Sequence, residues 1–162
     1  PVSPWEVRSV DRGFRGSGRA VAGDVAVKDG ARQAFAVDVV AAVVQNGDRY
    51  LLCQRPVGKR HGGLWEFPGG KVLDGETLEA ATRRELAEEL GVRTTRVFGE
   101  IERFQDEASE FLIHFLQVEI DGEPFAHEHQ QLDWFLLTEM RALPLAPADK
   151  ALVHLLTSGR AP

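Results

Sequence analysis

The chain has 162 residues, the usual length of one domain, so we expect a single full domain. Hydrophobic residues make up 43% of the chain and charged residues 27%, a balance that excludes a disordered, collagen-like or coiled-coil protein. The net charge of −6 at pH 7 disfavours non-specific binding to nucleic acid, so a partner that carries phosphate needs a metal ion to bridge the like charges.

Neither a membrane span nor an export signal is visible in the sequence. The longest uninterrupted apolar run, residues 39–44, is far shorter than the roughly 20 residues that cross a bilayer. The amino-terminal residues mix acidic and basic side chains and contain no apolar stretch of signal-peptide length. We therefore expect a cytoplasmic protein without a membrane partner. We also expect the single cysteine, Cys53, to be a small core residue.

The sequence pattern changes after about residue 35. Residues 1–35 contain five glycines and two prolines but no sustained helical or strand period, which predicts an irregular N-terminal extension before a folded domain at 36–162. That domain opens with alternating apolar residues, and Asn46-Gly47 then indicates a hairpin turn before a strand at 50–53. Pro68-Gly69-Gly70 predicts a tight turn whose glycines allow the backbone to approach a ligand.

A helix is predicted from Thr77, a suitable N-terminal cap, to Leu90, because Gly91 is a fitting stop. Further along the chain, Pro147 suits the start of a final helix. The other predicted elements are strands at 96–104, 110–120 and 133–137, a helical turn at 138–142 and a final helix at 148–157. This order of strands and helices predicts an α+β fold with a mixed sheet.

Acidic side chains gather on one side of the predicted helix. At about 100° per residue, Glu85, Glu88 and Glu89 fall within an arc of roughly 100°. The opposite side is expected to consist of Ala80, Leu86, Ala87 and Leu90. Like charges this close repel one another, which favours a bound cation, and oxygen ligands favour Mg²⁺ or Mn²⁺. The alternative is a helix face that is simply solvated.

From Gly70 to Val92 the sequence reads GKVLDGETLEAATRRELAEELGV. It resembles an intact Nudix box, G-x5-E-x7-R-E-U-x-E-E-x-G-U, where U is a bulky aliphatic residue. The matching positions are Gly70, Glu76, Arg84, Glu85, Glu88, Glu89 and Gly91, with Leu86 and Val92 as the aliphatic residues. At ordinary residue frequencies, seven fixed positions coincide by chance about once in 10⁸ windows. The resemblance therefore outweighs the alternative of a solvated helix face.

The resemblance extends beyond the box. Residues 64–71 and Gln54-Arg55-Pro56 look like the corresponding segments of MutT-type nucleoside triphosphate pyrophosphohydrolases. Residues 126–134 and 144–149 look most like the bacterial CTP pyrophosphohydrolase branch of that group. The resemblance covers roughly residues 36–156 and implies the Nudix fold, a mixed β-sheet sandwiched between helices.

The resemblance also implies a reaction, in which water attacks phosphorus with the help of Mg²⁺ or Mn²⁺ and releases nucleoside monophosphate and pyrophosphate. The implied small-molecule substrates are oxidised nucleotides such as 8-oxo-dGTP, and CTP or methylated dCTP. The implied metal ligands are Glu85, Glu88, Glu89, Glu128 and the Gly69 carbonyl. By the same resemblance, Arg84 orients the carboxylates, and Glu76 has a structural role at the start of the helix, where the helix dipole favours a carboxylate.

Glu128 is the first candidate for the base that activates the water, because it matches the glutamate that follows the last long strands of MutT-type enzymes. Glu85 is its competitor. His127 and His129 flank Glu128, and a His-x-His pair is compatible with zinc. No further Cys or His spacing completes a zinc site in the sequence, so the two histidines are expected to line the pocket or to face solvent.

Five residues are candidates for binding the substrate. Phe67 and Phe125 match apolar or aromatic positions near the nucleobase, where stacking contributes roughly 1–3 kcal/mol per base. Asp149 matches a polar residue that reads the edge of the base, and Arg55 and Lys71 are candidates for contacts with phosphate or base. The alternatives are core packing for the two rings, a favourable position at the start of the last helix for Asp149, and charge balance for the two cations.

Two other functions stay open. A Nudix enzyme of another class would cleave ADP-ribose or a nucleotide sugar. A non-catalytic nucleotide-sensing module of the same fold would bind its ligand without turnover, but such modules typically lose box carboxylates, and none is lost here. The intact box favours an enzyme. The sequence leaves both a monomer and a homodimer open.

Overall fold

The computed structural model describes residues 37–105 and 109–159. The N-terminal extension expected at 1–35 lies outside the described residues, so its irregular structure stays a prediction. Within the described part of the chain, no helix is both long enough and apolar enough to cross a membrane.

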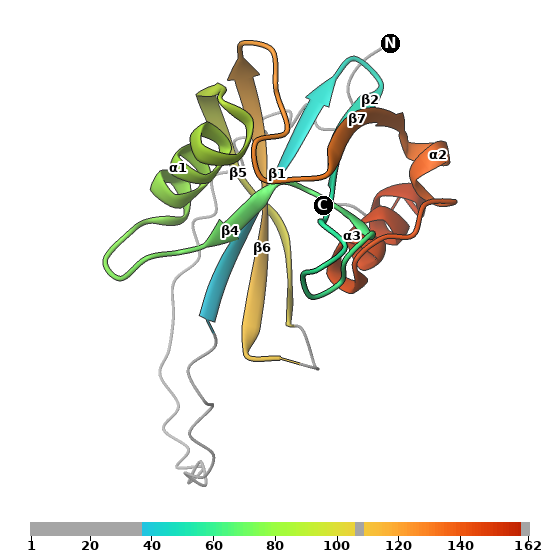
Figure 1. The fold of residues 1–162 in the computed structure, drawn as a ribbon, viewed down its shortest axis with the longest axis horizontal. Coiled ribbons are helices and arrows are strands. Elements are labelled where there is room, and N and C mark those ends of the chain that lie inside the picture. The colour runs from blue at the N-terminus through green and yellow to red at the C-terminus, as the bar shows by residue number, and fades with distance from the viewer. Residues whose placement is uncertain (1–36, 106–108, 160–162) are drawn as a thin grey trace, which may run out of the picture. The chain divides into compact units, whose positions relative to one another are not determined.

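Seven strands form one mixed sheet (Figure 1). They are β1 (Val37–Asn46), β2 (Arg49–Gln54), β3 (Trp65–Glu66), β4 (Gly69–Lys71), β5 (Arg93–Gln105), β6 (Phe111–Asp121) and β7 (Gln131–Leu136). The main path runs β3-β2-β1-β6-β5, with β4 beside β1 and β7 beside β2. β1 and β6 run parallel and the other pairs run antiparallel. The predicted mixed sheet is therefore confirmed.

The helices of the described residues are α1 (Leu78–Leu90), α2 (Leu137–Met140) and α3 (Pro147–Thr157). Figure 1 shows α1 on one side of the strands and α2 with α3 on the other. The expected α+β fold, with a mixed sheet between helices, is confirmed. All three predicted helical segments are present, and they differ from the prediction only at their terminal residues.

Successive side chains of β1 point to opposite faces of the sheet, and the two faces have different surroundings. On one face, Val40, Ala42 and Val44 belong to a buried core that includes Leu86 and Leu90 of α1. On the other face, Val39 and Ala41 line a pocket. Cys53 on the neighbouring β2 is fully buried in the same core, as expected, and burial raises the pKa of its thiol. One central strand thus supports α1 and forms part of the pocket wall.

α1 is closed at both ends by the residues that the sequence indicates. The Thr77 hydroxyl accepts a hydrogen bond from the Ala80 amide at 3.1 Å, which satisfies one of the free donors of the first turn. At the other end, Gly91 adopts a left-handed conformation with a φ of 67°, and its amide donates to the Ala87 carbonyl at 3.1 Å. These two caps fix where the acidic box residues begin and end.

Two local predictions are wrong. Gly69 and Gly70 do not form a tight turn, because they belong to β4 and pair with Ala41 and Val40 of β1. The backbone of β1 supplies hydrogen-bond partners for these glycines, and this pairing favours a strand over a turn. On α1, Ala80 and Ala87 are exposed, and the buried residues are Ala81, Thr82, Leu86, Glu89 and Leu90. The buried stripe of the helix therefore includes a carboxylate.

Candidate active site

A pocket of ≈ 570 Å³ lies where β1, β4, α1 and the start of α3 meet. This volume falls within the usual range of small-molecule sites, about 300–1,000 Å³. Eight of the predicted site residues line it: Arg55, Phe67, Gly69, Lys71, Glu85, Glu89, Glu128 and Asp149. They come from segments that are far apart in the sequence, so the fold itself assembles the pocket.

Three predicted site residues do not line this pocket. Arg84 lies behind Glu85 and contacts it, and the Glu88 side chain is 56% exposed and contacts Arg84. Phe125 is 63% exposed, and its backbone amide donates to the Leu90 carbonyl at 3.0 Å. Phe125 therefore attaches its loop to the end of α1, and the structure does not bring it to the predicted nucleobase site.

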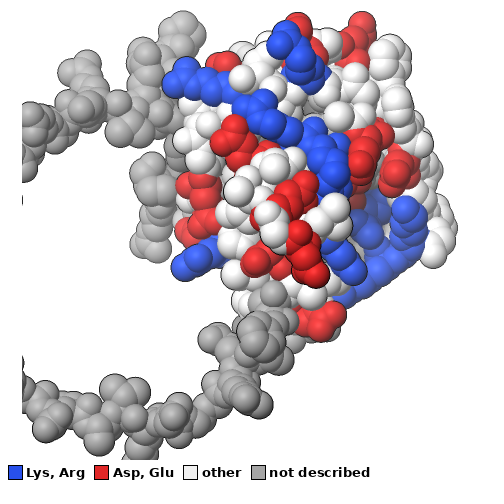
Figure 2. Space-filling view, turned by 90° about the vertical axis from the view of Figure 1, so that its left-hand side faces the viewer, with Lys and Arg blue, Asp and Glu red and all other residues white. Residues whose placement is uncertain are grey.

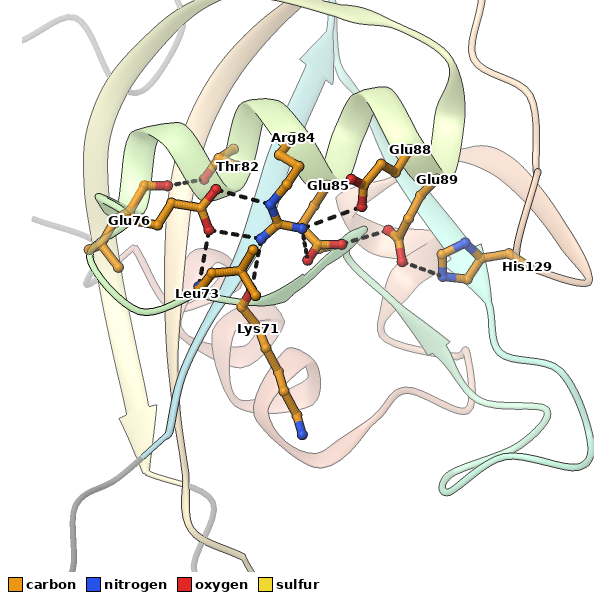
Figure 3. A network of polar contacts seen from close by, with 11 residues as sticks. Lys71, Leu73, Glu76, Thr82, Arg84, Glu85, Glu88, Glu89 and His129 are labelled. Atoms are coloured by element: carbon orange, nitrogen blue, oxygen red, sulfur yellow. Dashed lines mark hydrogen bonds and ion pairs between the residues drawn. The ribbon is translucent and has the colours of Figure 1, made fainter.

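Arg84 is the centre of a hydrogen-bonded network on α1 (Figure 3). Its Nε and Nη2 atoms donate to the two carboxylate oxygens of Glu76 at 2.9 and 2.8 Å. Its Nη1 donates to Glu85 at 2.7 Å, and its Nη2 also donates to the Lys71 carbonyl at 2.9 Å. A planar guanidinium can hold two carboxylates in this way, whereas an ammonium group cannot. These contacts fix Glu85 relative to β4.

Glu76 lies in the loop before α1, not in the first turn as the sequence analysis expects; the acidic residue of that turn is Glu79. The Glu76 carboxylate accepts a hydrogen bond from the Leu73 amide at 3.0 Å as well as those from Arg84. The Arg84 side chain is the main cause that lowers the pKa of Glu76, and the Leu73 amide adds to the shift. Its structural role is therefore to anchor Arg84 to the loop rather than to complement the helix dipole.

Glu89 is the most unusual carboxylate of the helix because it is only 8% exposed. Its Oε2 accepts a hydrogen bond from the Gly69 amide at 3.0 Å. Desolvation by burial raises its pKa to about 7; His129 works against this shift, and the nearby Glu85 carboxylate adds to it. A buried carboxylate beside a second carboxylate is an environment that a cation would stabilise.

The carboxylates of α1 have different partners in this structure. Among residues 37–105 and 109–159, no group of three or more His, Cys, Asp or Glu side chains is close enough to hold a metal ion. Arg84 draws Glu85 and Glu88 toward itself, while Glu89 turns to the Gly69 amide. The chemistry of the donors still fits a hard divalent cation, since the pocket offers carboxylate oxygens beside the backbone of β4.

The loop between β6 and β7 forms a second wall of the pocket and is attached to the C-terminal end of α1. Glu128 lines the pocket and is exposed, and its carboxylate makes no hydrogen bond or ion pair with the described residues. His129 also lines the pocket, with its side chain 5% exposed. His127 is exposed and lies against Gly91 at the end of α1. The structure thus separates the two histidines: one lines the pocket and the other faces solvent.

In another part of the pocket lining, Asp149 contacts the backbone of Phe67. The Phe67 amide donates to Asp149 Oδ1 at 2.7 Å, and Asp149 is buried. Burial raises the pKa of Asp149 to about 8, which keeps the carboxyl group protonated at neutral pH. A protonated carboxyl group can both donate and accept a hydrogen bond, so this part of the pocket suits a polar ring edge.

Cations also border the pocket. Arg55 donates from one nitrogen to both oxygens of Glu66, at 2.8 and 2.7 Å. The Lys71 ammonium lies 5.2 Å from the centroid of the Phe111 ring. Outside the pocket, the face of the molecule in Figure 2, on the side of α1, has basic side chains interspersed with acidic ones.

Several residues that line the pocket are not indicated by the sequence, among them Glu66, Phe111 and His61. Glu66 lies one residue before Phe67, but no motif separates it from an ordinary strand residue. Phe111 comes from the first position of β6, and only the parallel pairing of Val37 with Phe111 places it near β1. No local signal in the sequence predicts this pairing.

Comparisons with known proteins agree with this geometry. The profile of the NUDIX domain matches residues 35–156. The CTP pyrophosphohydrolase of Escherichia coli (strain K12) is 41% identical over 129 residues, which cover 77% of this chain and 94% of that protein. The 8-oxo-dGTP diphosphatase of Haemophilus influenzae is 40% identical over 124 residues, which cover 73% of this chain and 89% of that protein.

Solved structures give the same result. The E. coli ORF135 protein, solved in solution, matches with a TM-score of 0.66 at 41% identity, over 77% of this chain and 91% of that one. The crystal structure of the MutT NUDIX hydrolase from Burkholderia pseudomallei matches with a TM-score of 0.65 at 28% identity, over 73% of this chain and 95% of that one. The chain therefore belongs to the NUDIX family of hydrolases, and its relatives include enzymes of the MutT type.

Proposed function

We propose that the chain is a Mg²⁺-dependent nucleoside triphosphate pyrophosphohydrolase that releases nucleoside monophosphate and pyrophosphate. One observation carries the proposal: a single pocket is lined by box carboxylates, by cations and by the buried carboxyl group of Asp149. A nucleoside triphosphate offers phosphates to the cations and to a metal ion on the carboxylates, and a polar base edge to Asp149. The names of the relatives indicate CTP and 8-oxo-dGTP as the substrates to test, and hydrolysis of oxidised nucleotides would keep them out of DNA.

NUDIX hydrolases generally use divalent metal ions such as Mg²⁺. In our proposal the Gly69 carbonyl and the carboxylates of Glu85, Glu88 and Glu89 hold the ion, with Glu128 as a further ligand when it does not act as the base, and Mn²⁺ can replace Mg²⁺. When bound, the ion would neutralise charge on the phosphates and lower the pKa of the attacking water. Glu88 joins this set from the exposed side of α1, where Figure 3 places it beside Glu85.

The chain's own residues position these carboxylates. Arg84 fixes Glu85 through the 2.7 Å hydrogen bond, and the Gly69 amide fixes Glu89. We assign the general base to Glu128, because its exposed carboxylate has no partner among the described residues and so remains free to accept a proton. Glu85 remains the competing base, although Arg84 occupies one of its oxygens.

Asp149 is proposed to read the polar edge of the base beside Phe67, while Arg55 and Lys71 contact phosphates at the border of the pocket. Phe67 is 3% exposed and packs edge-on against Phe115, with 5.8 Å between the centroids of the two rings. Its ring therefore forms the floor of the base site and is not a free stacking surface. Phe125 is left out of the proposed site because it is exposed outside the pocket.

The test is a panel of nucleotides with and without Mg²⁺, in which monophosphate and pyrophosphate are measured together. We expect equal release of both products from CTP, 5-methyl-dCTP or 8-oxo-dGTP, and only with the metal. AMP and ribose 5-phosphate from ADP-ribose, with no turnover of triphosphates, would instead support the other Nudix enzyme class. Binding of triphosphates without turnover of any compound would support a sensing module.

A further inference from the structure

His129 lies at the centre of a row of polar side chains that crosses the pocket. Its Nε2 atom is 3.4 Å from Glu66 Oε1 and 4.0 Å from Glu89 Oε1, and only 5% of its side chain is exposed. Figure 3 shows the imidazole ring directed at the Glu89 carboxylate. Glu66 and Glu89 come from different elements, β3 and α1, so His129 is the side chain that connects them.

The contacts of the ring determine which nitrogen carries the proton. Nε2 faces two carboxylates at the distances of ion-pair contacts, and carboxylate oxygens favour a proton on this nitrogen. Nδ1 is buried and has no hydrogen-bond partner among the described residues. A buried polar atom without a partner is unfavourable, and an apolar ring would fill the same space without this cost. The histidine is thus suited to its Nε2 contacts and poorly suited to a packing role.

Both neighbours of His129 are themselves fixed. Arg55 binds both oxygens of Glu66, and this pair holds one end of the row. On either side of His129 the loop is attached through its backbone. The His127 amide donates to the Glu89 carbonyl at 2.9 Å, and the Gln130 amide donates to the Gln54 carbonyl at 2.9 Å. The ring is therefore held in place by both its loop and its neighbours.

We propose that His129 is a positioning residue, which together with Glu66 holds the Glu89 carboxylate in the orientation needed to bind a divalent cation. The inference rests on the proposed function, because that function makes Glu89 a metal ligand. It adds a role for two residues outside the Nudix box. The same row of side chains also connects Arg55, which is proposed to bind phosphate, with Glu89, which is proposed to bind the metal ion.

The test measures binding of Mn²⁺ to the full chain without substrate, from the electron paramagnetic resonance signal of the free ion. His129→Phe keeps a ring of similar size but removes the donor, whereas His129→Gln places an amide donor near the position of Nε2. His127→Ala, two residues away in the same loop, is the matched control because His127 is outside the pocket. Thermal unfolding of each variant checks that the fold is intact.

We expect His129→Phe to weaken Mn²⁺ binding about tenfold or more, as loss of an outer partner of a metal ligand commonly does. His129→Gln should restore most of the affinity, and His127→Ala should leave it unchanged. In turnover, His129→Phe should lower kcat much more than it changes KM, because the substrate contacts remain. Glu66→Gln should weaken Mn²⁺ binding in the wild-type background. It should have little further effect in His129→Phe, because the effects of substitutions at two residues that act together do not add up.

The outcomes separate this inference from the proposed function. If the wild-type chain binds Mn²⁺ and His129→Phe binds it equally well, the positioning role is wrong while the metal site stands. Equal loss in His129→Phe and His129→Gln would also reject the role, because the donor would then not matter. If the wild-type chain binds no Mn²⁺ with or without a nucleotide, the proposed function itself fails.

Discussion

The two walls of the pocket hold their acidic residues in different ways. On α1, Arg84 makes hydrogen bonds to Glu76, Glu85 and the backbone of β4, so the carboxylates belong to a connected network (Figure 3). On the loop before β7, Glu128 is exposed and has no partner among the described residues. A rigid wall suits the binding of an ion, whereas a free carboxylate suits the transfer of a proton.

The largest effect should come from the α1 wall. Glu89→Gln keeps the shape of the buried side chain but removes its charge, so we expect kcat/KM to fall about 1,000-fold with Mg²⁺, since metal stabilisation of developing charge is worth several kcal/mol. Release of pyrophosphate measures the loss, and the melting temperature should not fall. Wild-type turnover in this variant would remove Glu89 from the metal site.

The loop wall should give a smaller loss. Glu128→Gln removes the proposed base, and a positioned base typically contributes about 100-fold or more to the rate. We expect about a 100-fold decrease in kcat, with the fold intact because Glu128 makes no hydrogen bond or ion pair with the described residues. A loss of kcat larger than the loss in Glu89→Gln would contradict the predicted order of the two walls. An unchanged kcat would mean that Glu85, not Glu128, is the base.

The network behind the α1 wall should tolerate even a conservative change poorly. Arg84→Lys keeps the charge but loses the planar fork that binds Glu76 and Glu85 together, and we expect kcat to fall about tenfold or more. Arg83→Lys is the matched control, because Arg83 pairs with Glu79 at 2.8 Å and lies outside the pocket. If both variants lost the same activity, the effect would reflect the helix rather than the network.

The last effect concerns stability rather than rate, and it comes from Asp149, away from the two acidic walls. Asp149 has its pKa raised from 3.8 to about 8, so between these pH values the folded protein holds a proton that the unfolded chain releases. The stability that this group contributes is therefore lost as pH rises from about 4 to 8, by up to about 1.4 kcal/mol per pH unit. Asp149→Asn mimics the protonated form and should lose less stability between pH 5 and 7.

Urea denaturation of both proteins at pH 5 and pH 7 measures this difference. We expect the midpoint of the wild-type chain to fall more steeply with pH than that of Asp149→Asn. Parallel changes in the two midpoints would mean that Asp149 is already ionised in the folded protein.

Local signals in the sequence account for much of the fold and for one wall of the site. The caps at Thr77 and Gly91 and the helical period place α1 correctly, and the box residues follow from it. The strand β4 is not predictable in the same way, because Gly69 and Gly70 become a strand only by pairing with β1, about 30 residues earlier.

The remaining part of the site depends on contacts between distant segments. The burial of Glu89 and its contact with the Gly69 amide depend on that same strand, not on the helix alone. Glu66 and His129 meet only because β2 lies between β3 and β7. Periodicity within one segment carries no information about such neighbours.

The central claim is that this pocket takes up divalent ions together with a nucleotide. The most direct test is a calorimetric titration of the full chain with Mg²⁺ in the presence of a non-hydrolysable CTP analogue, with Glu89→Gln as the comparison. We expect saturable Mg²⁺ binding to the wild-type chain and much weaker binding to the variant. Absence of binding to the wild-type chain, or equal binding to both proteins, would contradict the assignment of the acidic wall as a metal site.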